Sequence, residues 1–186
     1  MAGIGFIPVG GMDGRPYNGA TQRCVVLGAV TDNIHIGDCV LLGGTGDASG
    51  VPDVTKCAAT NVIFGVVVAV EPTTANSLPY AAGSVTTDQY VHVAVGTDAM
   101  LFKGKVSAAV AKTSVGLLAD IVVADGAAPY YTSQSTWNAG ATGTSTASFQ
   151  LVGFLQDGVD VTDANKICIF RLAEPQIGQT LTSVGV

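Results

Sequence analysis

The chain has 186 residues, of which 48% are hydrophobic and only 12% charged, and its formal net charge is -6. An average soluble protein carries roughly 25% charged residues, so we expect partners to cover much of this surface. The length favours one domain. The 8 lysines and arginines are scattered singly along the chain, which argues against direct binding of nucleic acid.

Neither targeting nor membrane insertion is predicted. Residues 1–8 have no basic side chain before their apolar residues, unlike a secretory signal. The longest uncharged apolar run, residues 57–70, is shorter than the roughly 20 residues of a membrane-spanning helix. We therefore expect no membrane partner, and a protein made and kept in the cytosol or in an assembly that forms there.

The two ends of the chain differ from its middle. Residues 1–22 hold six glycines, two prolines and isolated large side chains without a sustained period, a pattern that predicts an extended N-terminal arm. Residues 175–186 also lack a helical or strand period and predict an extended C-terminal arm. We expect both arms to become ordered only on a partner, and the domain between them to span residues 23–174.

Short apolar runs rich in Val, Ile and Phe recur between turn residues within this domain. Their spacing predicts an all-β fold, a single jelly-roll-like β-sandwich or barrel. The 24 glycines indicate many tight turns. The runs span residues 24–30, 39–42, 62–70, 90–95, 100–102, 117–123, 148–155 and 166–172.

Two strands and two loops have distinctive patterns. In residues 90–95 the valines alternate with other residues, which indicates one core-facing side. Residues 61–70 are apolar on both faces, so we expect a second sheet or a neighbouring subunit to cover each side. Residues 72–87 and 124–146 are longer than hairpin turns, and long loops of this kind usually carry contacts.

A glycine-rich segment at residues 39–50 is the strongest enzyme-like motif. An apolar strand that runs into a Gly-Gly-x-Gly turn is similar to the phosphate-binding turn of dinucleotide folds. That chemistry needs a helix whose N-terminal amides hold the pyrophosphate, but Val51-Pro52-Asp53 follows at once. We interpret the segment as a loop that joins two strands.

The two histidines are the candidate general bases near neutral pH. His35 is close to Asp38 and Cys39, so a Cys–His pair is conceivable, but no glycine elbow marks a nucleophile and we interpret His35 as a solvated loop residue. His92 alternates with valines, and we expect it to face solvent or a subunit boundary. No catalytic set follows from these residues, so the sequence predicts no enzyme.

Cysteines and aspartates supply no clear metal site. The cysteines at positions 24, 39, 57 and 168 form no C-x-x-C pair, and apolar neighbours indicate buried thiols in a reducing compartment, with disulfides as the alternative. Asp157, Asp160 and Asp163 recur every third residue, unlike a calcium loop. We interpret them as a polar connection, with a calcium site as the alternative, and expect no cofactor.

Several segments, in order, resemble one known family. They are GDCVLLGGTG at residues 37–46, FGVVVAV at 64–70, YVHVAV at 90–95, VGLLADIV at 115–122 and the paired closing segments 146–155 and 164–170. Together they resemble the capsid cement, or decoration, proteins of tailed bacteriophages, over roughly residues 23–175. The resemblance implies a β-rich homotrimer on the outer surface of the virion capsid, where it binds the major capsid protein and ties capsomers together.

The candidate contact residues lie in the N-terminal arm and in the second long loop. They are Phe6, Ile7, Pro8 and Tyr17 in the arm, and Pro129, Tyr130, Tyr131 and Trp137 in the loop. The alternative function is a carbohydrate-binding β-sandwich that uses Tyr130, Tyr131 and Trp137 as a stacking platform. A nucleotide-dependent oxidoreductase that uses residues 43–50 is a weaker third hypothesis.

Overall fold

The computed structural model describes residues 4–73, 77–143, 147–155 and 166–177, and these residues are almost entirely β-structure. Two short 3₁₀ turns, Lys112–Ser114 and Ala139–Ala141, complete the regular elements of these ranges. The strands are β1 (Ile7–Gly11), β2 (Gln22–Val26), β3 (Ile34–His35), β4 (Cys39–Gly46), β5 (Pro52–Lys56), β6 (Gly65–Val70), β7 (Tyr80–Ala81), β8 (Gln89–Val95), β9 (Met100–Lys105), β10 (Leu118–Ala119), β11 (Ile121–Val122), β12 (Thr136–Trp137), β13 (Phe149–Phe154) and β14 (Ile167–Leu172).

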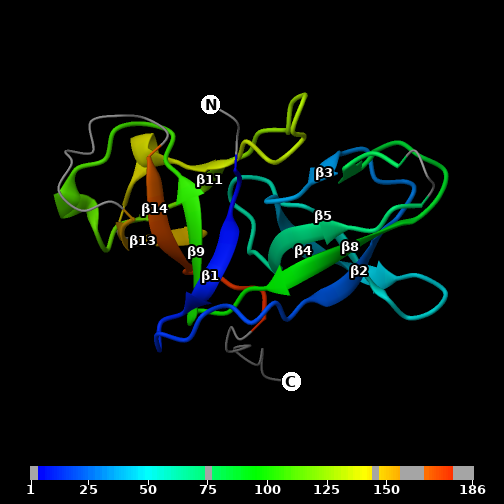
Figure 1. Ribbon diagram of the computed structural model, residues 1–186, viewed down its shortest axis with the longest axis horizontal. Helices are drawn as coiled ribbons and strands as arrows, with labels where there is room; N and C mark the ends of the chain where they lie inside the picture. The colour runs from blue at the N-terminus through cyan, green and yellow to red at the C-terminus, as the bar shows by residue number, and fades with distance from the viewer. Residues whose placement is uncertain (1–3, 74–76, 144–146, 156–165, 178–186) are drawn as a thin grey trace, which may run out of the picture.

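The strands form a closed barrel and an open sheet that lie side by side (Figure 1). The barrel order is β2-β5-β4-β6-β8, and the sheet order is β1-β9-β14-β13-β10. Two further two-stranded sheets pair β3 with β7 and β11 with β12. The predicted all-β sandwich or barrel is confirmed, and each of the eight predicted runs coincides with or overlaps a strand.

Each unit has its own hydrophobic core, and one strand contributes to both. Val67 of β6 packs inside the barrel with Val40, Val91 and Val93. Its neighbour Val66 points the other way and belongs to the core of the open sheet. One face of β6 is therefore covered by the barrel core and the other by the open sheet of the same chain. A neighbouring subunit is not needed to explain why both faces are apolar.

The prediction of an unpacked arm over residues 1–22 is wrong for the segment from Phe6 to β1. Phe6 is 1% exposed, and its ring stacks on Phe149 with a centroid distance of 4.5 Å. Strand β1 pairs with β9, Ile7 lying opposite Lys103. Gly104 makes room for this packing, since a Cβ atom there would lie 2.8 Å from the Phe6 ring.

The prediction of a C-terminal arm from residue 175 is also wrong for its first residues. Pro175 bridges to Ile63, and the Gln176 amide N–H donates to the Ile63 carbonyl at 2.8 Å. The Gln176 side-chain oxygen accepts a hydrogen bond of 2.7 Å from the Leu42 amide. The rest of that predicted arm, residues 178–186, lies outside the described ranges. Among the residues described, no helix has the length and hydrophobicity to span a membrane.

Candidate functional site: the contact loop and its buried anchor

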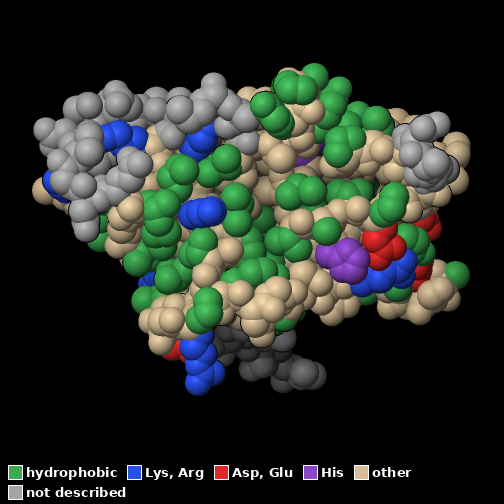
Figure 2. All heavy atoms as spheres, viewed as in Figure 1, with side chains coloured by type: hydrophobic (Ala, Val, Ile, Leu, Met, Phe, Trp, Pro, Cys, Tyr) green, Lys and Arg blue, Asp and Glu red, His purple; other side chains and the backbone are tan. Residues whose placement is uncertain are grey.

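The most exposed aromatic side chain lies in the segment between β11 and β12, residues 124–135, which we call the contact loop. The loop extends beyond the strands in Figure 1, where it is drawn in yellow-green. Tyr130 is 66% exposed and its neighbour Pro129 is also exposed. Val122 and Val123 are exposed where the chain enters the loop. Figure 2 shows hydrophobic side chains gathered over this part of the molecule.

Backbone hydrogen bonds close the base of the contact loop and attach it to the residue that follows β3. The Gln134 amide donates to the Ala124 carbonyl at 3.1 Å, and the Ser133 amide donates to the Ile36 carbonyl at 2.9 Å. The ring of Tyr131 lies against Tyr80 of β7, with 5.5 Å between centroids. The base is therefore held on both sides, while the tip that carries Tyr130 reaches solvent.

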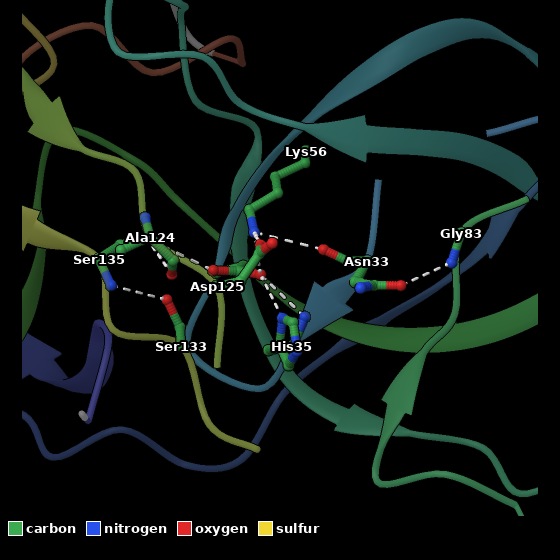
Figure 3. Close-up of polar contacts among 9 residues, drawn as sticks. Asn33, His35, Lys56, Gly83, Ala124, Asp125, Ser133 and Ser135 are labelled. Atoms are coloured by element: carbon green, nitrogen blue, oxygen red, sulfur yellow. Dashed lines mark hydrogen bonds and ion pairs between the residues drawn. The ribbon is translucent and has the colours of Figure 1, made fainter. Parts of the chain in front are cut away.

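Polar side chains at the base of the contact loop and beneath it form what we call the buried anchor (Figure 3). The side chains of His35, Asp38, Lys56, Ser133 and Ser135 are shielded from solvent, and Asp125 is the exposed member of the cluster, with a side chain that is 63% exposed. Asp38 is 0% exposed, and its Oδ2 accepts the His35 backbone N–H at 2.8 Å and lies 3.2 Å from Lys56 Nζ. The Ser135 hydroxyl lies 3.5 Å from Asp38 Oδ1, a long contact.

Lys56 links the buried carboxylate of Asp38 to the contact loop. Its side chain is 6% exposed and its ammonium group forms ion pairs with Asp38 and with Asp125, which belongs to the loop. The same Nζ donates to the carbonyl of Asn33 at 3.3 Å. Asn33 and Asp38 lie on either side of β3, Lys56 is the last residue of β5, and Asp125 is in the contact loop. The anchor therefore ties three separate parts of the chain together.

The pKa directions show how strongly the anchor charges depend on one another. Burial by itself raises the pKa of Asp38, but contacts with His35 and Ser133 and the charge of Lys56 outweigh it and lower the pKa below the usual value. Burial lowers the pKa of Lys56, but Asp38 and Asp125 outweigh that effect and raise it. Both groups are therefore charged at neutral pH.

The order of the anchor residues does not fit nucleophilic catalysis. A serine hydrolase needs its histidine between the aspartate and the serine. Here Asp38 occupies the middle, because both serines and His35 converge on its carboxylate. His35 Nδ1 lies 3.5 Å from Asp38 Oδ2, too long for a well-formed hydrogen bond, and has no hydrogen-bond partner in the described part of the chain. The geometry is that of a structural support.

The interpretation of His35 as a solvated loop residue is wrong. His35 is 1% exposed, lies in β3 opposite Tyr80, and stacks on the Tyr80 ring at 4.7 Å. The two-residue strand is too short to show a period in the sequence. His92 agrees better with its interpretation, since its side chain is 35% exposed and its Nε2 lies 3.0 Å from Glu71.

Of the candidate contact residues of the loop, some are exposed and others are buried. Trp137 is 0% exposed and its indole N–H donates to the Phe149 carbonyl at 3.3 Å, so it is a core residue and cannot stack on a sugar. Tyr131 is half-buried against Tyr80. The three-ring platform of the carbohydrate hypothesis is therefore absent, and Pro129 and Tyr130 remain as exposed candidates.

The candidates of the N-terminal segment are mostly unavailable to a partner. Phe6 and Pro8 are buried and Ile7 is half-buried in the open sheet. Tyr17 is half-buried, its hydroxyl donates to the Ala20 carbonyl at 2.6 Å, and it lines a surface hollow of about 690 Å³. Tyr17 is thus the one member of that group placed on an open surface.

The glycine-rich segment forms a β-hairpin, as interpreted from the sequence. Strand β4 turns into β5 with Gly46 opposite Pro52, so no helix follows the glycines. Asp53 explains the glycine at position 43, because a Cβ there would lie 2.0 Å from its carboxylate. That carboxylate accepts the Thr45 amide at 2.7 Å and occupies the space beside the turn.

The four cysteines are buried thiols, as predicted. No group of three or more potential metal ligands occurs among the residues with described positions. Asp157, Asp160 and Asp163, the alternative calcium ligands, lie outside them.

Comparison with protein-family models, with curated proteins and with solved structures finds no match. The contribution of Asp38, Lys56 and Asp125 was missed in the sequence. Lys56 and Asp125 are 69 positions apart and neither lies in a recognisable motif, so no local signal links them.

Proposed function

We propose that this chain is a structural protein of a virion, a decoration protein that binds the outer surface of a tailed-phage head. Its partners are the major capsid protein and two further copies of itself, in a homotrimer assembled in the host cytoplasm. The ordered resemblance over residues 23–175 and the all-β fold support this proposal. The low proportion of charged residues fits a surface that is covered in an assembly.

The observation that carries the proposal is the exposed tip of the contact loop above its fixed base. Tyr130 is 66% exposed, whereas the loop beneath it is hydrogen-bonded to Ile36 and ion-paired to Lys56. Tyrosine is enriched among the residues that dominate binding energy at protein interfaces. A loop that is already held in place loses less conformational entropy on docking, which favours binding.

The physical role follows from linkage. A protein that binds the expanded shell and not its unassembled subunits stabilises the expanded shell by mass action. A trimer that contacts three equivalent sites gains further, because each contact after the first is intramolecular. Modest contacts through loops such as residues 124–135 are then sufficient, and no catalytic chemistry is required.

The experiment measures attachment to heads purified from a lysate of the phage that encodes the chain. Added purified protein should co-sediment with heads that lack it, saturate at a fixed number of copies, and raise the temperature at which the heads release DNA. Tyr130→Ala should weaken the attachment, whereas Met12→Ala, which removes another exposed side chain on the turn after β1, should not. Wild-type protein that does not bind such heads contradicts the proposal.

A further inference from the structure

Two of the four thiols lie opposite each other on neighbouring strands. Strands β4 and β5 are antiparallel with Val40 opposite Lys56, and the same register places Cys39 opposite Cys57. The Cys57 amide N–H donates to the Cys39 carbonyl at 3.0 Å, which continues the ladder one step past the end of β5. The two residues are therefore a directly opposed cross-strand pair.

Both side chains also lie on the same face. Cys39 and Cys57 are each 2% exposed and belong to the core of the open sheet, whereas their neighbour Val40 points into the barrel. Opposed residues in a hydrogen-bonded antiparallel pair have Cα atoms about 5.5 Å apart. Disulfides most often join Cα atoms about 5.5–6 Å apart, so the Cα spacing of this pair suits the bond. The Cβ atoms of such a pair start farther apart than the roughly 3.5–4.5 Å of a disulfide, so the two strands have to move slightly closer as the bond forms.

The other two cysteines do not share this arrangement. Cys24 of β2 lies in the barrel core, and Cys168 of β14 lies opposite Gly104 on one side and Phe154 on the other. Neither has a cysteine opposite it in the strand register.

A reagent can approach this pair from one side. Cys57 lines a surface hollow of about 650 Å³, whose other lining residues include Lys56, Ile121 and Asn138. Cys39 is not among the lining residues and lies one strand further in. Of the two cysteines, Cys57 is therefore the one nearer to a small molecule in the hollow. Only 2% of its surface is exposed and its thiol donates to the Val62 carbonyl at 3.7 Å, so this hydrogen bond has to open before the sulfur reacts.

We propose that Cys39 and Cys57 are a latent cross-strand disulfide, reduced when the protein is made and closed later by a small-molecule disulfide such as oxidised glutathione. The Cys57 sulfur attacks one glutathione sulfur and releases the first glutathione thiol. The Cys39 sulfur then attacks the Cys57 sulfur and releases the second. The protein loses two electrons and two protons, and these convert one oxidised glutathione into two reduced molecules.

This pair differs from a preformed structural disulfide in its kinetics. Burial raises the pKa of Cys57 to about 12, and burial also raises that of Cys39 well above the usual thiol range. Because the thiolate is the attacking species, exchange in the folded protein is slow. The dithiol therefore persists through assembly, and the bond accumulates during long storage in an oxidising medium, where it stabilises the β4–β5 hairpin.

The test uses the folded full-length chain incubated with oxidised glutathione, quenched in acid, alkylated and cleaved before aspartate. Cleavage at Asp38 and Asp53 separates the two cysteines onto different peptides. The four cysteine peptides are then residues 13–31, 38–46, 53–87 and 163–186. We expect 38–46 linked to 53–87 by a bond that reduction removes, and a melting temperature about 5–10 °C higher.

The variants Cys24→Ser and Cys168→Ser are the matched controls, and both should keep the linkage and the thermal shift. Cys39→Ser should lose both. A link to either of the other two peptides, glutathione that remains on Cys57 without a linked partner, or four free thiols after prolonged incubation overturns the inference. The peptide map of the wild-type chain decides the question even where Cys39→Ser fails to fold.

Discussion

Replacing Phe6 with alanine tests whether the N-terminal segment belongs to the core or to an arm. The ring is 1% exposed, lies nearly parallel to Phe149 at an interplanar angle of 7°, and meets the edge of Phe170 at 6.0 Å. Truncation of a buried phenylalanine lowers the free energy of unfolding by about 3–5 kcal/mol. The backbone of Gly104 lies against the ring and cannot fill the space, so we expect a value in the upper half of that range.

A loss of this size is a large part of the 5–15 kcal/mol that stabilises a typical domain. At about 2–4 °C per kcal/mol for a chain of this length, the melting temperature should fall by roughly 15 °C. Trp137 is the only tryptophan, is 0% exposed and lies in the same core, so its fluorescence reports the unfolding of this sheet directly.

The assay is urea unfolding followed by Trp137 fluorescence, with Tyr130→Ala as the matched aromatic control. Tyr130 is 66% exposed, so its truncation should change the free energy of unfolding by less than about 0.5 kcal/mol. A loss of less than about 1 kcal/mol in Phe6→Ala would show that the Phe6 ring is not part of the core. Deletion of residues 2–16 removes strand β1 as well as Phe6, so we expect that truncation to destabilise the open sheet more than Phe6→Ala does.

The remaining predictions concern the loop, the anchor and the glycine beside Phe6. Tyr130→Ala should lower occupancy on heads with an unchanged melting temperature, measured by co-sedimentation and calorimetry. Gly104→Ala should destabilise the chain by about 1–3 kcal/mol, because the new methyl group meets the ring of Phe6, and urea titration measures this. Asp38→Asn should lower stability by about 3 kcal/mol at neutral pH, since it removes one partner of a buried ion pair. The pKa of Asp38 is lowered in the folded state, so its contribution is present above the unfolded value of about 3.9 and is lost as pH falls through the folded value. The stability of Asp38→Asn should therefore fall less steeply than that of the wild type below about pH 4.

The strands that the sequence predicts correctly are those with a clear apolar period. Residues 90–95 alternate in side-chain type and form β8, with Val91 and Val93 fully buried. Strand β5 was missed because its five residues begin with Pro52 and end with Lys56, and no apolar run marks them. Strand β1 was missed because Phe6 stands alone among glycines, and only its packing on Phe149 and Phe170 makes it a core residue.

The contacts of the buried anchor could not be predicted from the sequence for a different reason. Its contacts join residues far apart in the chain, as in the 97 positions between Asp38 and Ser135. Aspartates and serines in a chain rich in turns are expected at the surface, and burial becomes acceptable only when all the partners converge. That convergence is a property of the folded barrel and of the contact loop together.

The buried position of Phe6 also changes how attachment to a capsid has to be tested. A deletion of the N-terminal residues removes part of the open-sheet core, so a loss of binding by the truncated chain reports misfolding as well as lost contact. The exposed apolar side chains, by contrast, are concentrated in turns and loops, as at Met12, Leu78 and Tyr130. Single substitutions there leave the two cores intact, because these side chains add little to packing. If the chain binds a shell, its contacts are therefore separable from its folding, and a set of such variants can map the bound face while every member remains folded.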